Sequence, residues 1–132
     1  MNDSEVRTFL RAAAIRLTSA QILFDAGQHS DSMYFAGYVV ECAMKALLLA
    51  RTPKRSRDQL KIFSGEKGHN LEHLSSLIRR HNQLPRPIPD YLRRLRSWKT
   101  TLRYETHRGD PNEAKSYLEA AEGVLKWVQK NV

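Results

Sequence analysis

Hydrophobic residues recur every three or four positions along two long stretches in the first half of the chain, which is the spacing of one helix face. The first stretch, residues 4–26, has a single apolar stripe, with Ser4 as the expected N-cap and Gly27 as the expected left-handed stop. The second stretch, from residue 30 or 31 to about 51, is apolar around almost its whole circumference. We expect this helix at the centre of a bundle or in a dimer interface.

Three further helices are predicted in the second half of the chain. Residues 53–68 have no sustained period and contain five basic residues, so we expect a long basic loop there. Residues 70–81 and 90–105 each carry one apolar face and are separated by alternating prolines. The last helix begins at the capping residue Asp110. No segment alternates with period two, so the predicted fold is all-α, an up-and-down bundle of about five helices in one domain, residues 1–132.

Positive charge is concentrated in the middle of the chain. The net charge is +8 over 132 residues. Residues 51–108 hold 15 basic and five acidic residues, whereas each flanking region is close to −1. Such a concentration indicates a surface that faces an anion, with nucleic acid or a nucleotide as the first candidate. The alternative is a solvated basic face that serves only solubility.

A pair of basic residues near the end of the predicted fourth helix has the composition of an acid–base site. Arg103 and His107 are four residues apart, a spacing that brings helical side chains together. An imidazole can exchange a proton near neutral pH, and a guanidinium can hold a phosphate oxygen, so the pair suits metal-free attack by a ribose hydroxyl. The same helical arc carries Arg93, Arg96 and Lys99. The alternative is that these cations only complement the helix dipole.

Two charged residues, Glu41 and Lys45, interrupt the most apolar helix. A carboxylate or an ammonium buried there needs a partner. One hypothesis is that Glu41 orients a catalytic Arg or His of a neighbouring helix. The other is that Glu41 and Lys45, at the favoured spacing of four, form a structural pair within the bundle.

Residues 69–73, His-Asn-Leu-Glu-His, match a pattern found in one class of zinc peptidases. A catalytic zinc site needs a third protein ligand and a cleft, and no clear acidic ligand follows. We interpret the two histidines as a helix-start residue and a surface residue, and we predict neither a metal site nor a cofactor.

The composition excludes several classes of protein. Hydrophobic residues make up 41% and charged residues 27% of the chain, which is typical of a globular domain rather than a disordered one. The longest strictly apolar run, residues 46–50, is far shorter than the ~18 residues of a membrane span, and the acidic start is unlike a secretory signal. The only cysteine, Cys42, excludes an intramolecular disulfide and is expected in the core. We expect a cytoplasmic protein that does not bind membranes.

Four elements stand out in order along the chain: the opening helix that ends at residues 24–27, the run 34–48 with its Glu41 and Lys45, the element Gly-His-Asn-Leu-Glu-His-Leu at 68–74, and the Leu-Arg-Tyr segment at 102–104. Together they resemble the HEPN family (higher eukaryotes and prokaryotes nucleotide-binding domain). The resemblance spans residues 9–128. It implies a HEPN-like bundle that forms a homodimer through its long helices. It also implies a small nucleotidyltransferase partner, as in toxin–antitoxin or related defence modules.

The resemblance leaves the activity open. Active members are metal-independent ribonucleases with an Arg-x(4–6)-His motif, often in a composite site across the dimer, whereas Arg103 and His107 have three residues between them. In an active endoribonuclease His107 would be the general acid and base, Arg103 the phosphate clamp and Glu41 the orienting group. In a non-catalytic member the same surface would bind nucleotide or RNA, and a third alternative is a helical interaction domain without either activity. The residues expected to bind nucleotide or RNA are Lys45, Arg93, Arg96, Lys99, Arg103 and Tyr104.

Overall fold

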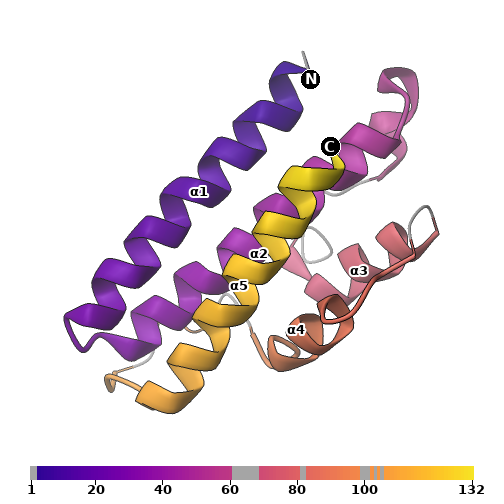
Figure 1. Ribbon diagram of the computed structural model, residues 1–132. Helices are drawn as coiled ribbons and strands as arrows, with labels where there is room; N and C mark the ends of the chain where they lie inside the picture. Colours follow the sequence, from indigo (N-terminus) through magenta and orange to yellow (C-terminus); the bar gives the residue numbers. More distant parts are fainter. Residues whose placement is uncertain (1–2, 61–68, 81–82, 99–101, 103, 105) are drawn as a thin grey trace.

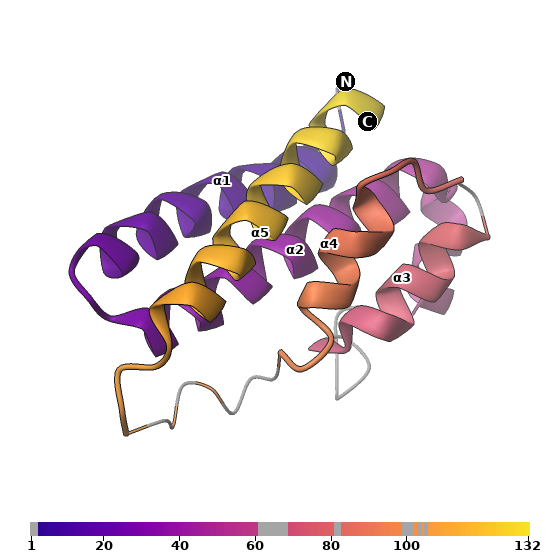
Figure 2. The ribbon, with the colours of Figure 1, turned by 60° about the horizontal axis from the view of Figure 1, so that its bottom comes forward.

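The structure, a computed structural model, describes residues 3–60, 69–80, 83–98, 102, 104 and 106–132, and every regular element among them is a helix. In chain order these are α1 (Ser4–Asp25), α2 (His29–Arg51), the 3₁₀ helix η1 (Lys54–Leu60), α3 (Leu71–Arg79), α4 (Ile88–Arg94) and α5 (Pro111–Asn131). Helix α1 lies on one side of α2, and α3 and α4 lie on the other (Figures 1 and 2). The predicted all-α bundle is confirmed.

Helix α1 is capped one residue earlier than predicted. The N-cap is Asp3, whose carboxylate accepts hydrogen bonds from the amides of Glu5 and Val6, and Ser4 is the first helical residue. The helix stops before Gly27, which has φ +78° and is the left-handed residue that the sequence predicts. The reversal at this glycine lets α1 pack antiparallel to α2 (Figure 1).

Helix α2 is the central helix and contacts α1, α3 and α5. Its apolar residues are buried on nearly every face within this one chain, and each large one, such as Leu47, contributes roughly 1.5–3 kcal/mol by burial. Of the two positions that the sequence left open for this helix, the structure shows the centre of the bundle. Length and composition alone would let α2 cross a membrane, but 72% of its most apolar 18-residue window is buried in the bundle. Helix α2 is thus the core helix of this fold.

Helix α5 starts as the sequence predicts and runs parallel to α2. Asp110 accepts a hydrogen bond from the amide of Asn112, and a proline occupies the first turn. At the other end of the helix, Arg51 Nη2 donates to the carbonyl of Asn131 across 2.6 Å and joins the ends of α2 and α5. The two termini of the chain consequently lie at the same end of the bundle (Figure 2).

The segment between α3 and α5 differs from its prediction. Helix α4 ends at Arg94, whereas we predicted a helix from 90 to 105. After Leu92 the amides bond to carbonyls three residues back, as in Leu95 to Leu92 at 3.2 Å and Trp98 to Leu95 at 2.9 Å. This tighter turn lets both Leu95 and Trp98 reach the core, where they are 0% and 5% exposed. Burial of these two side chains therefore accompanies the end of the helix.

The expected basic loop is also partly wrong, because residues 54–60 form η1, while residues 61–68 lie outside the described residues. Arg57 in η1 is buried, and its guanidinium donates to Asp3, to Glu5 at 3.0 Å and to the carbonyl of Leu49 at 2.9 Å. This arginine joins the start of α1 to the end of α2 and does not face an external anion. Its hydrogen bond lowers the pKa of Asp3 to about 2.

The lowered pKa of Asp3 predicts how stability depends on pH. A carboxyl group whose pKa is lower in the folded state than in the unfolded state stabilises the fold at any pH above its unfolded-state pKa. That contribution disappears as the pH falls through the folded-state pKa. We expect Asp3→Asn to reduce the free energy of unfolding by about 1–2 kcal/mol at pH 7, because it weakens a charge-assisted hydrogen bond to Arg57. The difference from wild type should shrink between pH 4 and pH 2 in urea denaturation.

Asp58→Asn is the matched control, because Asp58 is an exposed carboxylate on η1. We expect it to change the free energy of unfolding by less than about 0.5 kcal/mol at any of these pH values. A destabilisation by Asp3→Asn that stays constant from pH 7 to pH 2 would contradict the ionic role of Asp3.

Candidate functional site

Glu41 is the centre of a buried ionic cluster in the middle of α2. Its side chain is only 4% exposed. Glu41 Oε2 lies 3.0 Å from Lys45 Nζ, one turn later, and Oε1 lies 2.9 Å from His69 Nδ1. The structure therefore shows the helical pair with Lys45 that the sequence left as one alternative, together with a contact to His69 from the segment before α3.

Each contact has a local cause in the sequence. The spacing of four places Lys45 directly above Glu41 on the helix. His69 comes just before Asn70, whose side chain caps α3 by accepting from the amide of His73 at 3.0 Å. That cap fixes where α3 starts, and α3 packs on α2, so His69 is placed beside Glu41. An ionised carboxylate is tolerated in the core because both of its oxygens have charged or polar partners.

Three aromatic residues, Tyr34, Tyr38 and Trp98, form an aromatic cluster next to His69. The Tyr38 ring lies edge-on to the His69 ring at 6.3 Å and edge-on to the Trp98 ring at 5.6 Å. Trp98 Nε1 donates to the carbonyl of Tyr34 across 3.1 Å. The indole can approach α2 this closely because residue 37 is glycine, where a Cβ would lie 2.0 Å from the ring. This cluster therefore fixes the turn after α4 against α2.

The same turn carries exposed positive charge toward the start of α3. Arg96 Nε lies 3.7 Å from Glu72 Oε1, and both side chains are exposed. A surface pair of this kind contributes little to stability, but it shows that the turn after α4 lies against the first turn of α3. Arg93 is exposed one turn earlier, in the last turn of α4. The site thus combines a half-exposed histidine with nearby arginines.

The structure does not confirm the proposed helical pairing of Arg103 and His107. His107 lies in a bend between α4 and α5 and is exposed, so the spacing of a helix does not apply to it, and Arg103 and Lys99 lie outside the described residues. Tyr104 is 70% exposed. Lys45, which we expected among the residues that bind nucleotide or RNA, is 5% exposed and paired with Glu41, as in the structural alternative.

Sequence reasoning missed the partnership of Glu41 with His69, and it missed the internal role of Arg57. The available indication for His69 was the conjunction of a charged residue in an apolar helix with a histidine just before a capping asparagine. Among the described residues no group of three or more His, Cys, Asp or Glu is placed to hold a metal ion. Burial, with a smaller contribution from Glu41, raises the pKa of the Cys42 thiol to about 11, so this thiol is protonated near neutral pH.

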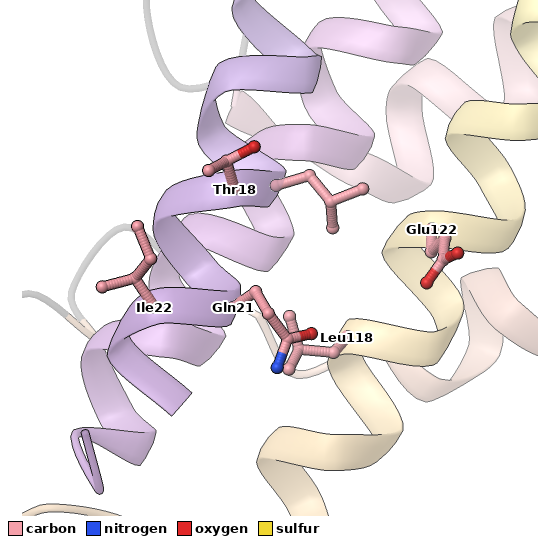
Figure 3. A pocket seen from close by; sticks show the side chains of 6 residues that line it. Thr18, Gln21, Ile22, Leu118 and Glu122 are labelled. Atoms are coloured by element: carbon pink, nitrogen blue, oxygen red, sulfur yellow. The ribbon is translucent and has the colours of Figure 1, made fainter. Parts of the chain in front are cut away.

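A shallow groove on the other side of the molecule lies between α1 and α5 (Figure 3). It is lined by Leu17, Thr18, Gln21, Ile22, Leu118 and Glu122. Ile22 and the nearby Ile15 are 62% and 52% exposed. The acid in this groove, Glu122, is paired with Lys126 at 2.8 Å. The groove therefore has the character of a contact surface rather than of a reactive site.

The buried Glu41–Lys45 pair predicts a non-additive mutant cycle. We expect Glu41→Gln to lower the free energy of unfolding by about 3 kcal/mol, because it leaves the Lys45 ammonium buried without a counter-charge. The double variant Glu41→Leu/Lys45→Met removes both charges, so we expect it to be more stable than Glu41→Gln. Urea denaturation at pH 7 measures both. Glu122→Gln, which removes one partner of an exposed pair, is the control, and we expect it to change the free energy of unfolding by less than about 1 kcal/mol. Equal decreases in the free energy of unfolding for Glu41→Gln and Glu122→Gln would contradict the prediction.

Comparison with known proteins places this arrangement in a family. Residues 6–131 match the family model described as the HEPN domain, which supports a function connected with nucleotides or RNA in general. The crystal structure of TT1696 from Thermus thermophilus has the same fold, with a TM-score of 0.75 and 21% sequence identity over 98% of this chain and 100% of that chain. No curated protein matches the sequence. Because the family model covers nearly the whole chain, the protein belongs to the HEPN domain family.

Proposed function

We propose that this HEPN protein binds RNA or a nucleotide through the exposed basic residues of α4 and of the turn that follows it. The observation that carries the proposal is that every described Lys and Arg between residues 51 and 108 except Arg57 is exposed. Exposed positive charge attracts phosphate groups, whose counterions are released on binding. The membership in the HEPN family supports the same class of ligand.

Arg93 and Arg96 are the described arginines best placed for this contact. Both are exposed, and they lie within one turn of each other at the end of α4. Arg94 is held more closely by carboxylates of this chain, because it pairs with Asp90 at 3.0 Å and approaches Glu119 at 4.0 Å, whereas Arg96 lies 3.7 Å from Glu72. The sequence continues from this turn into the other residues expected to bind, Lys99, Arg103 and Tyr104.

The binding proposal predicts a loss of salt-dependent affinity in Arg93→Gln/Arg96→Gln. Each phosphate contact contributes about 0.7 to the slope of log affinity against log salt for a single strand, so removal of two contacts should reduce the slope by about 1.4. Fluorescence anisotropy with a labelled single-stranded RNA between about 50 and 200 mM salt measures it. Arg11→Gln/Arg16→Gln on α1 removes the same charge elsewhere and should leave the slope nearly unchanged. An equal decrease in both variants would show a non-specific charge effect and contradict the proposed site.

A cleavage assay on the same samples in excess EDTA, with the RNA products separated on a gel, distinguishes RNA binding from ribonuclease activity. On the binding proposal, RNA affinity decreases with salt and no product forms. Product from wild type but not from His107→Ala would establish a metal-independent endoribonuclease instead. The absence of salt-dependent affinity would favour a helical interaction domain without RNA binding.

We further propose that the protein is a cytoplasmic homodimer that acts with a small nucleotidyltransferase partner in a toxin–antitoxin or defence-type module. The partner and the module rest on the resemblance of the sequence to the HEPN family. The exposed Ile15 and Ile22 on α1 support a dimer through that helix, since exposed apolar side chains mark contact surfaces. Ile22 lies at the groove between α1 and α5 (Figure 3).

Light scattering tests both associations. We expect wild type at micromolar concentration to have the mass of two chains, because α1 buries its exposed isoleucines against a second copy. Ile22→Glu should shift it to the mass of one chain, whereas Ser76→Glu on the exposed face of α3 should not. Co-expression with a small nucleotidyltransferase from the same genome should give a larger complex. A wild-type monomer would contradict the dimer, and separate elution would contradict the partner.

A further inference from the structure

We propose that His69, positioned by Glu41, is the hydrogen-bond acceptor for a ribose 2′-hydroxyl group in the RNA or nucleotide site. This inference rests on the proposed function and adds to it a specific residue and a reason for preferring RNA to DNA. It is independent of Arg103 and His107, because His69 lies before α3 and contacts α2.

The contact with Glu41 assigns the proton on the imidazole ring. Glu41 pairs with the ammonium of Lys45 through Oε2, so the carboxylate is ionised and can only accept hydrogen bonds. Oε1, 2.9 Å from His69 Nδ1, therefore accepts the Nδ1–H hydrogen bond. In the neutral imidazole the lone pair is then on Nε2, across the ring from the buried carboxylate.

The ring is placed to offer that lone pair to a ligand. The His69 side chain is 46% exposed, while Glu41 behind it is 4% exposed. No hydrogen bond joins Nε2 to another residue in the ranges that the structure describes. The Tyr38 ring lies edge-on to the imidazole, with the two ring centroids 6.3 Å apart. A hydrogen bond from the N–H of one ring nitrogen to a carboxylate also makes the other ring nitrogen a stronger hydrogen-bond acceptor.

The surroundings of His69 indicate which donor it would meet. Arg96 contacts Glu72 in the first turn of α3, and Trp98 of the same turn contacts the Tyr38 ring that borders His69. The ligand that fits here offers a hydrogen-bond donor close to a negative charge. A ribonucleotide has both, a 2′-hydroxyl beside its phosphate, and DNA lacks the hydroxyl.

A purely structural role for His69 is the competing explanation, and His69→Asn distinguishes the two. The asparagine amide nitrogen can take the place of Nδ1 and donate to Glu41, so the buried carboxylate keeps its partner. Asparagine has no atom at the position of Nε2, so the proposed acceptor is lost. His73→Asn, one turn along α3, is the matched control, because its side chain has no hydrogen bond to Glu41.

The experiment compares the affinities of one single-stranded RNA and of the deoxyuridine-containing DNA of the same sequence by anisotropy at pH 8. We expect wild type and His73→Asn to prefer RNA by roughly three- to tenfold, the change that one net hydrogen bond gives. His69→Asn should bind both strands with the weaker affinity, with an unchanged midpoint of thermal unfolding. As a second measurement, ¹⁵N NMR of the free wild type should show the proton of the His69 ring on Nδ1, and addition of adenosine monophosphate should shift Nε2.

The outcomes separate the inference from the proposed function. An RNA preference that persists in His69→Asn, or equal affinity of wild type for both strands, overturns the role of His69 and leaves nucleic-acid binding intact. A proton found on Nε2 in the free protein also overturns it. If wild type binds neither RNA nor DNA nor adenosine monophosphate, the proposed function is wrong, and the proposed role of His69 is wrong with it.

Discussion

The burial of α2 on every side is the constraint on which this fold depends. A helix that is apolar around its circumference must be surrounded, and α1, α3 and α5 do so within a single chain. The turn at Gly27 lets α1 pack against one face of α2, and α5 runs parallel to α2 and covers another face (Figure 1). Helix α4 packs on α5, and the turn after it closes against α2 through Trp98. The arrangement of the bundle thus follows from covering one helix.

Glu41 is a buried carboxylate in an otherwise apolar part of the central helix. A carboxylate in the central helix is stable only with partners, and Lys45 supplies one from the same helix. The second partner, His69, comes from the segment before α3 and remains half exposed. A buried charge is in this way connected to the surface through a single imidazole ring. Arg96, in the turn after α4, lies beside the same first turn of α3.

The basic middle of the chain divides into two parts with different roles. Arg57 is directed inward and ties the start of α1 to the end of α2, although in sequence it resembles its exposed neighbours. Arg93 and Arg96 are directed outward. Net charge in a sequence reveals that a cationic surface exists, but the direction of each side chain is set by the helix to which it belongs. Helix α4 ends at Arg94 and His107 lies in a bend, so the helical pairing of His107 with Arg103 is not confirmed, and Arg103 itself lies outside the described residues.

The sequence by itself determined the helical class, the need to bury α2 on several sides, the stop at Gly27 and the start of α5 after Asp110, because periodicity and capping are local properties of the chain. Only the tertiary structure decided that η1 replaces part of a loop, that α4 stops at Arg94 and that Glu41 holds His69. Each of these depends on a contact between residues far apart in sequence. Apolar burial of Trp98 and pairing of the buried Glu41 carboxylate outweigh the local preferences of the segments that they join.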